Sequence, residues 1–216
     1  MLEKMGDFFD NRLSEYDNHQ MTCIDSAEEF YLFTAGCLPA GATSRILDLG
    51  CGTGLELERY YKLNPSAKVV GIDLAPRMLN ALKNKFKDKD LTLILGSYFD
   101  VEFESDAFDA VVSVESLHHF TKAEKIPLYH KIGKALKSDG YFILTDYFSL
   151  SDSDEEFQRK ELLRLKKLQG ISDSEFYHYD TPLTVQHETE ALQAAGFSKI
   201  DILNHWGATY TLKAEK

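Results

Sequence analysis

From about residue 45 onward, short apolar runs alternate with stretches in which apolar residues recur at helical spacing. Most of the short runs are rich in Val, Ile and Leu with little polar alternation, which is typical of strands covered on both faces. Strands that alternate with amphipathic helices predict an α/β fold with a parallel sheet wound by crossover helices. The predicted strands are Arg45–Leu49, Lys68–Asp73, Leu91–Leu95, Phe108–Val114 and Tyr141–Asp146.

Two crossover helices have clear boundary signals. The first follows Pro76, because proline is favoured in the first turn of a helix. The second begins at the capping box Thr121-Lys122-Ala123-Glu124, continues through Leu136 and is expected to stop at Gly140. Each helix would cross from one strand to the next.

The chain changes character after the fifth predicted strand. Residues 149–156 are acidic and rich in serine, and the helix predicted behind them carries Leu162, Leu165 and Leu168, so this segment looks inserted. A further helix ends near Gly196. Two last strands, over 199–205 and 208–213, are joined by Trp206-Gly207, a link short enough to favour an antiparallel hairpin.

The composition narrows the classes of function. With 216 residues, 44% of them hydrophobic, the chain can bury a substantial core as one large domain. No apolar run approaches the length of a membrane span, so we expect no membrane association and a cytoplasmic location. Three cysteines without a C-x-x-C pair indicate neither a disulfide framework nor a zinc site, and no metal is expected.

The net charge of the chain bears on which partners it can bind. A formal net charge of −11 opposes attraction to phosphate backbones, so nucleic acid is a disfavoured partner. The basic cluster Arg159, Lys160, Arg164, Lys166 and Lys167 is the exception, but acidic residues flank it, and we expect a solvated helix face. The sequence leaves a homodimer open.

A glycine-rich loop, Gly50-Cys51-Gly52-Thr53-Gly54, follows directly after the first predicted strand. Glycines permit a tight turn there and let a ligand approach bare backbone near a helix N-terminus. Asp73 lies 19 residues past Gly54 at the end of the second strand, where a carboxylate can accept hydrogen bonds from a ribose. Leu55 replaces the third glycine of a dinucleotide fingerprint, and Asp48 would repel a pyrophosphate.

Three ordered segments resemble class I S-adenosylmethionine-dependent methyltransferases, of the type 11, 12 and 25 groups. They are Ile46–Gly54 (ILDLGCGTG), Val69–Leu74 (VVGIDL) and Phe108–Phe120 (FDAVVSVESLHHF). The resemblance implies a Rossmann-like seven-stranded α/β fold, with five parallel strands, a C-terminal antiparallel hairpin and helices on both faces. It also implies S-adenosylmethionine as the cofactor and S-adenosylhomocysteine as the product.

The resemblance further implies which residues would bind the cofactor. Asp48 and the backbone of Gly50, Cys51, Gly52 and Gly54 would hold the methionine part, Asp73 the ribose hydroxyls, and Leu74 and Met78 the adenine. Ser97 and Tyr98 follow the third strand, Val114 and Glu115 end the fourth, and Tyr16 would close over the cofactor carboxylate from an N-terminal lid. Because Ser97 replaces an acidic residue common there, adenine recognition would rest on weaker contacts.

The expected organisation has four parts. Residues 1–40 form an N-terminal helical lid, 41–149 the cofactor-binding core, 150–181 a helical insertion acting as a substrate lid, and 182–216 the helix and hairpin that complete the core.

Three residues are candidates for chemistry beside the cofactor. Methyl transfer from a sulfonium needs an aligned nucleophile and a dry site, so a catalytic base is not required. If one exists, His118 and His119 are the best candidates, since they follow the fourth strand at the carboxyl edge of the sheet. Tyr147 would orient a substrate. The alternative stays open that one histidine caps a helix, the other packs, and Tyr147 fills the core.

Three functions follow from these observations. The first is methyl transfer to a small neutral or cationic molecule. The second is a carboxy-S-adenosylmethionine synthase, an enzyme of tRNA wobble-uridine modification, which Leu144–Ser153 and Pro182–Phe197 resemble. The third is a noncatalytic cofactor-binding module. An open space lined by the candidate residues would favour catalysis, whereas a filled one would favour binding alone.

Overall fold

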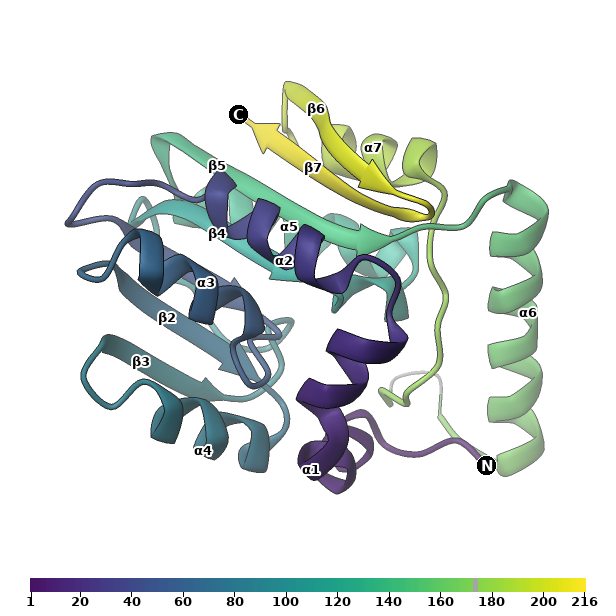
Figure 1. The fold of residues 1–216 in the computed structure, drawn as a ribbon. Coiled ribbons are helices and arrows are strands. Elements are labelled where there is room, and N and C mark those ends of the chain that lie inside the picture. Colours follow the sequence, from purple (N-terminus) through teal and green to yellow (C-terminus); the bar gives the residue numbers. More distant parts are fainter. Residues whose placement is uncertain (173–174) are drawn as a thin grey trace.

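The computed structural model of the protein describes residues 1–172 and 175–216. Seven strands form one sheet in the order β3-β2-β1-β4-β5-β7-β6 (Figure 1). The first five are parallel, and β5-β7-β6 is antiparallel, so the predicted fold class is confirmed. The strands are β1 (Arg45–Leu49), β2 (Lys68–Asp73), β3 (Asp90–Leu95), β4 (Phe108–Val114), β5 (Leu136–Tyr147), β6 (Lys199–Trp206) and β7 (Thr209–Glu215).

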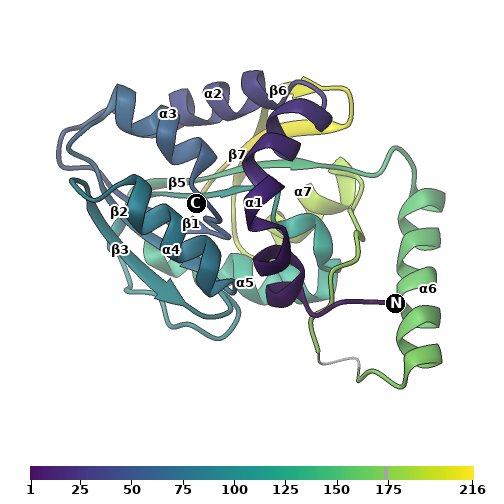
Figure 2. The ribbon, with the colours of Figure 1, turned by 60° about the horizontal axis from the view of Figure 1, so that its bottom comes forward.

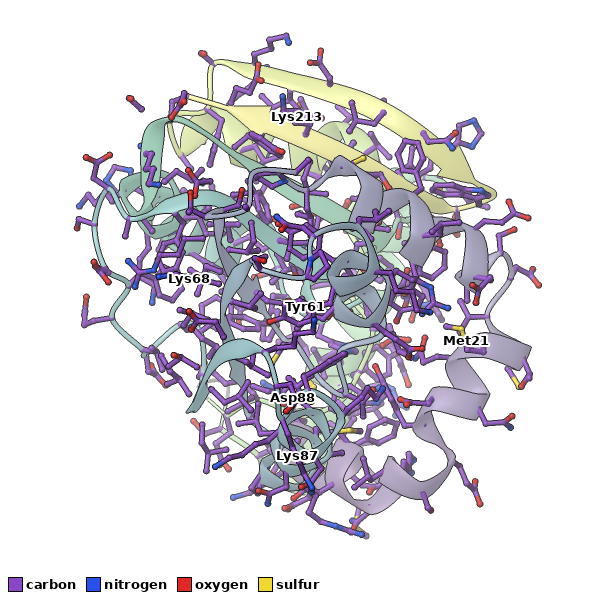
Figure 3. All side chains as sticks on the ribbon, turned by 60° about the vertical axis from the view of Figure 1, so that its left-hand side comes forward. Met21, Tyr61, Lys68, Lys87, Asp88 and Lys213 are labelled. Atoms are coloured by element: carbon purple, nitrogen blue, oxygen red, sulfur yellow. The ribbon has the colours of Figure 1, made fainter. Side chains whose placement is uncertain are left out.

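Helices cover both faces of the sheet. The structure has α1 (Met5–Cys23), α2 (Ala27–Cys37), α3 (Leu55–Leu63), α4 (Pro76–Lys85), α5 (Lys122–Ala135), α6 (Asp152–Gln169) and α7 (Val185–Ala194), with a short 3₁₀ helix over Leu117–His119. Alternate strand residues serve opposite faces, as the pleat requires. Ile46 packs in the cluster that contains α2 and α3, whereas Leu47 packs in the cluster that contains α5 and α7. Figure 3 shows Tyr61 of α3 among these closely packed side chains, its ring centroid 5.1 Å from that of Phe86.

Two predicted boundaries were wrong. The helix expected to stop at Gly140 ends at Ala135, because Leu136 pairs with Phe108 and already belongs to β5. A side chain at Gly140 would lie 2.9 Å from the Phe108 carbonyl oxygen, so the glycine marks a close approach of two strands. The hairpin link is Gly207-Ala208, because β6 continues through Trp206. The capping box at Thr121 is confirmed.

The segments predicted as lids meet at one side of the molecule. Lys4 forms a β-bridge with Tyr177, the Met5 N–H donates to the Phe176 carbonyl, and the His178 N–H donates to that of Glu3. Helix α6 stands apart from the sheet beyond them (Figure 2). Two residues of the predicted insertion, 173 and 174, lie outside the described residues, and the boundaries at residues 40, 149 and 181 stay predictions.

Helix α6 carries the basic cluster. Lys160 pairs with Glu156, and Arg164 pairs with Glu161, as a solvated face predicts. Lys166 was wrongly placed on that face, because it is buried and donates to the Glu175 carbonyl. Within the described ranges, no helix has the length and apolar character needed to cross a bilayer.

A buried ion pair joins helix α5 to helix α7. The Lys125 ammonium lies 2.5 Å from the Glu188 carboxylate, and both side chains are almost inaccessible. The Tyr129 hydroxyl also donates to Glu188. Lys122 and Glu190 join the same two helices, but that pair is partly exposed.

We predict that Glu188→Ala lowers the free energy of unfolding by about 3–5 kcal/mol, because it leaves the Lys125 charge buried without a partner. Lys122→Ala is the matched control and should cost less than about 1 kcal/mol. Urea denaturation measures both values. Equal losses would show that burial does not distinguish the two pairs.

Candidate functional site

The glycine loop turns sharply between β1 and α3. Gly50 and Gly54 both have φ of 75°, in the left-handed region where side chains are disfavoured. A Cβ on Gly50 would lie 2.1 Å from the Ser116 hydroxyl oxygen, and one on Gly54 would lie 2.3 Å from a Leu82 methyl carbon. Both conformation and space therefore require glycine at these positions.

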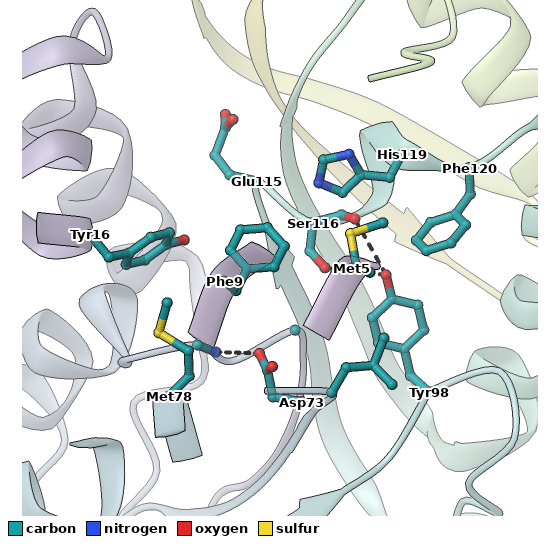
Figure 4. Close-up of a pocket in the computed structure, with 13 residues that line it drawn as sticks. Met5, Phe9, Tyr16, Asp73, Met78, Tyr98, Glu115, Ser116, His119 and Phe120 are labelled. Atoms are coloured by element: carbon teal, nitrogen blue, oxygen red, sulfur yellow. Dashed lines mark hydrogen bonds between the residues drawn. The ribbon is translucent and has the colours of Figure 1, made fainter. Parts of the chain in front are cut away.

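Asp73 holds this loop in place from the end of β2. Its carboxylate accepts a hydrogen bond from the Gly52 N–H at 2.8 Å (Figure 4) and another from the Ala75 N–H, also at 2.8 Å. A carboxylate has about four acceptor positions, so two backbone donors leave capacity for the hydroxyls of a ribose. Asp73 is thus both a support for the loop and a free acceptor beside it.

A cavity lies beside the loop, with about 530 Å³ of empty space when its opening to solvent is included. Three of its wall residues, Met5, Phe9 and Tyr16, lie on one face of α1 at helical spacing. The complete lining is Met5, Phe9, Tyr16, Gly50, Gly52, Asp73, Leu74, Met78, Tyr98, Glu115, Ser116, His119 and Phe120 (Figure 4). Apolar walls, exposed loop backbone and a strand-end carboxylate fit a nucleoside linked to an amino acid.

The predicted cofactor residues fall into two groups. Tyr16, Gly50, Gly52, Asp73, Leu74, Met78, Tyr98 and Glu115 line this cavity. Asp48, Cys51, Gly54, Ser97 and Val114 do not line it. Cys51, Ser97 and Val114 are buried, and their roles in binding stay predictions. Sequence reasoning missed Ser116 and the apolar residues Met5, Phe9 and Phe120, although the spacing along α1 was a usable signal for Met5 and Phe9.

Asp48 forms a buried pair with Glu56 behind the loop. Burial, together with the neighbouring Glu56 carboxylate, holds the pKa of Asp48 well above its ordinary value, and burial also raises the pKa of Glu56. One oxygen of each carboxyl group makes no hydrogen bond within the described residues.

Glu115 stands in a strained conformation at the end of β4. Its φ is 50°, unusual for a residue with a side chain, and its N–H donates to the Thr145 carbonyl at 2.8 Å. Burial, with the charge of Asp146, raises the pKa of its carboxyl group to about 8. Such strain is retained where surrounding structure enforces it, often at functional sites.

A second cavity, of about 1340 Å³ with its open mouth, adjoins the first. Phe9, Tyr16, Glu115 and His119 line both cavities. His118 and Tyr147 line only the second, together with His178 and Asp180, which sequence reasoning did not select. The three predicted catalytic candidates are therefore brought together around one space, and we call it the acceptor cavity.

The two adjacent histidines have opposite electrostatic environments. Burial would lower the pKa of His118, but Asp146, with its Oδ1 2.5 Å from Nδ1, outweighs burial and raises this pKa to about 9. Burial and the charge on His118 lower the pKa of His119 to about 4. His118 is thus the charged member of the pair at neutral pH.

The comparisons with known proteins agree with this geometry. A family model described as a methyltransferase domain matches residues 46–140. The biotin biosynthesis bifunctional protein BioHC of Teredinibacter turnerae is 27% identical, over 85% of this chain and 36% of that protein. A carboxy-S-adenosyl-L-methionine synthase of Nautilia profundicola is 25% identical, over 80% of this chain and 77% of the synthase. The solved DhpI-SAM-HEP complex has a TM-score of 0.70 at 18% identity, with 97% and 95% coverage.

Residues 46–140 match a methyltransferase domain, and the chain is similar to S-adenosylmethionine-dependent methyltransferases over most of its length. These matches support S-adenosylmethionine as the cofactor. The chain spans about a third of the bifunctional relative and about three quarters of the synthase.

We predict that Asp73→Ala weakens S-adenosylmethionine binding by about 1–3 kcal/mol, roughly 5- to 150-fold in Kd, because a charged acceptor is lost. Asp109→Ala is the matched control. Asp109 also accepts a backbone N–H, from Arg45 at 2.7 Å, but does so at the start of β4 and outside both cavities. Calorimetry should show full affinity in the control. Unchanged affinity in folded Asp73→Ala would mean that the ribose site is misplaced.

Proposed function

We propose that this protein transfers the methyl group of S-adenosylmethionine to a small molecule held in the acceptor cavity. The observation that supports this most strongly is that the two cavities are adjacent and share the lining residues Phe9, Tyr16, Glu115 and His119. A molecule in the acceptor cavity would face the cofactor across these shared walls, and methyl transfer needs that direct approach.

The cofactor, when bound, supplies an electrophilic methyl group on a sulfonium. The acceptor must meet it with water excluded, and the aromatic rings of Phe9 and Tyr16 provide apolar walls at the junction. Burial and the charge of Asp73 raise the pKa of Tyr16, so its hydroxyl stays protonated. Tyr147 lies within hydrogen-bonding reach of Asp180 and would orient the acceptor.

The charges around the acceptor cavity favour a small neutral or cationic acceptor over a polyanion. Glu15, Glu115 and Asp180 line it. Arg12 also lines it, but its guanidinium donates to both carboxylate oxygens of Glu3. Together with the net charge of −11, these carboxylates would repel a phosphate backbone.

A carboxy-S-adenosylmethionine synthase is the second candidate, favoured by the match to the Nautilia enzyme over most of both chains. Its product carries one more carboxylate than S-adenosylmethionine. Arg12 is the arginine on the wall of the acceptor cavity and is already paired with Glu3, whereas the carboxylates of Glu15 and Asp180 line the same cavity. The electrostatics therefore favour methyl transfer to a separate acceptor. A noncatalytic module is disfavoured because the space beside His118, His119 and Tyr147 is open rather than filled.

The proposal predicts S-adenosylhomocysteine release when the protein is screened against small amines, alcohols, phenols and thiols. With the best acceptor, Tyr147→Phe should lower turnover about 5- to 150-fold, because a hydrogen bond beside a charged group is lost, while cofactor affinity stays unchanged. Tyr179→Phe is the matched control, since its hydroxyl donates to Gln158 on α6 instead. Formation of carboxy-S-adenosylmethionine, without methyl transfer to any of the acceptors, would favour the synthase.

A second prediction concerns access to the cofactor. Because α1 supplies wall residues and pairs with residues 176–178, both segments must move to admit the ligand. S-adenosylmethionine should slow amide hydrogen exchange in Met5–Tyr16 and 175–181, with no change in the outer strand β6. Exchange as slow as that of β1 without cofactor, and indifferent to it, would contradict a lid role.

A further inference from the structure

Two histidines and one carboxylate converge on the wall of the acceptor cavity. The His119 Nδ1 atom lies 3.1 Å from Asp180 Oδ1, and the His118 Nε2 atom lies 3.7 Å from the same oxygen. One ligating atom from each residue lies within 4.8 Å of the other two. Asp180 Oδ1 is buried and makes no hydrogen bond of acceptable geometry within the described ranges. An unsatisfied oxygen therefore sits between two imidazoles.

The spacing matches the first coordination sphere of a transition metal. With metal–ligand bonds of about 2.0–2.2 Å, neighbouring ligand atoms in tetrahedral or octahedral geometry lie about 3.0–3.6 Å apart. The His119–Asp180 distance lies within that range and the His118–Asp180 distance is slightly above it, while the three ligating atoms together lie within 4.8 Å of one another, so the side chains would have to draw together around an ion. A set of two histidines and one carboxylate leaves coordination positions open, and here the open side faces the acceptor cavity.

The surroundings of His118 match those of a metal ligand. Metal-binding histidines almost always donate their second ring N–H to a carboxylate or carbonyl, which fixes the tautomer and the ring orientation. His118 Nδ1 lies 2.5 Å from Asp146 Oδ1, which leaves Nε2 directed toward Asp180. Because His118 is protonated when no ion is bound, the ion would have to displace the proton on Nε2. Asp146 also accepts the backbone N–H groups of Leu117 and His118, so this support is rigid.

We propose that His118, His119 and Asp180 bind one divalent transition metal ion, such as Zn²⁺ or Fe²⁺, at the wall of the acceptor cavity. Imidazole ligands favour these ions over Mg²⁺ or Ca²⁺, which take oxygen ligands. The carboxylate of Glu15 on the same cavity adds to the attraction for a cation. No metal was expected from the sequence because the cysteines lack metal-binding spacing. That spacing carries no information about a site built from histidines and a carboxylate.

The role of the metal rests on the proposed function and narrows the acceptor to a hydroxylated small molecule. A hydroxyl oxygen bound at an open position would lose its proton to solvent at lower pH than in water. That oxygen then forms a bond to the methyl carbon as the carbon–sulfur bond breaks and its electron pair remains on sulfur. The products are an O-methyl ether and S-adenosylhomocysteine.

Metal binding is tested on the full chain after chelator treatment and dialysis. Titration with Co²⁺ should give visible ligand-field bands that saturate at one ion per chain, and calorimetry with Zn²⁺ should give a Kd in the micromolar range or tighter. His119→Ala and Asp180→Ala should each weaken Zn²⁺ binding at least 10-fold, the usual scale for altering a metal site. Circular dichroism and thermal unfolding, measured on the same samples, establish that each variant is folded.

His187→Ala is the matched control, since His187 also lies beside carboxylates, with Nδ1 2.8 Å from Glu155, but outside the acceptor cavity. Unchanged Zn²⁺ affinity in this variant supports the site. Binding weaker than millimolar, or binding lost equally in His187→Ala, overturns it. Full turnover of an acceptor in the presence of chelator would overturn the metal's role and leave the proposed function intact. Binding of one ion by a protein that does not bind S-adenosylmethionine would support the metal site and overturn the proposed function.

Discussion

The arrangement of the acceptor cavity depends on one buried carboxylate, Asp146, at the end of β5. Removing a carboxylate from water costs several kcal/mol, so it must be matched by donors. Asp146 accepts the backbone N–H groups of Leu117 and His118 at 2.8 and 3.0 Å, and it pairs with the His118 imidazole. These bonds hold the connection between β4 and α5 against the sheet edge. The Thr181 N–H then donates to the His118 carbonyl, which fastens the distant segment carrying Asp180 to the same point.

Asp73 plays the corresponding part at the end of β2. Each carboxylate stands where a parallel strand ends and accepts N–H groups from the backbone of a neighbouring connection. The sheet order places β1 between β2 and β4, so the connections after β1 and β4 leave on opposite faces. Ligands of open α/β sheets bind at such a switch point. Two strand-end acids thus position the cofactor loop and the acceptor wall on either side of it.

Much of the fold and part of the site could be predicted because their signals are local. The strands, the glycine loop and Asp73 lie within a short stretch of chain with fixed spacing. The end of α5 was missed because the apolar spacing is still helical at Leu136, whereas Leu136 pairs with Phe108 in the sheet. Lys125 and Glu188 resemble surface residues in sequence, yet they are buried because they meet each other. Asp180 has no periodic signal, and tertiary contacts such as the backbone bond of Thr181 to His118 bring it to the cavity.

The pKa values of His118 and His119 shift in opposite directions, and these shifts set the charge on the wall of the acceptor cavity. Asp146 holds His118 protonated, and that charge, added to burial, keeps the neighbouring imidazole of His119 neutral. Asp180 faces both rings, and the histidines keep its pKa low despite burial. With Glu15 also on the wall, the carboxylates of Asp180 and Glu15 outnumber the single protonated imidazole, because Arg12 is paired with Glu3. The groups that line the cavity therefore carry a net negative charge, which a bound cation would offset and an anionic acceptor would increase.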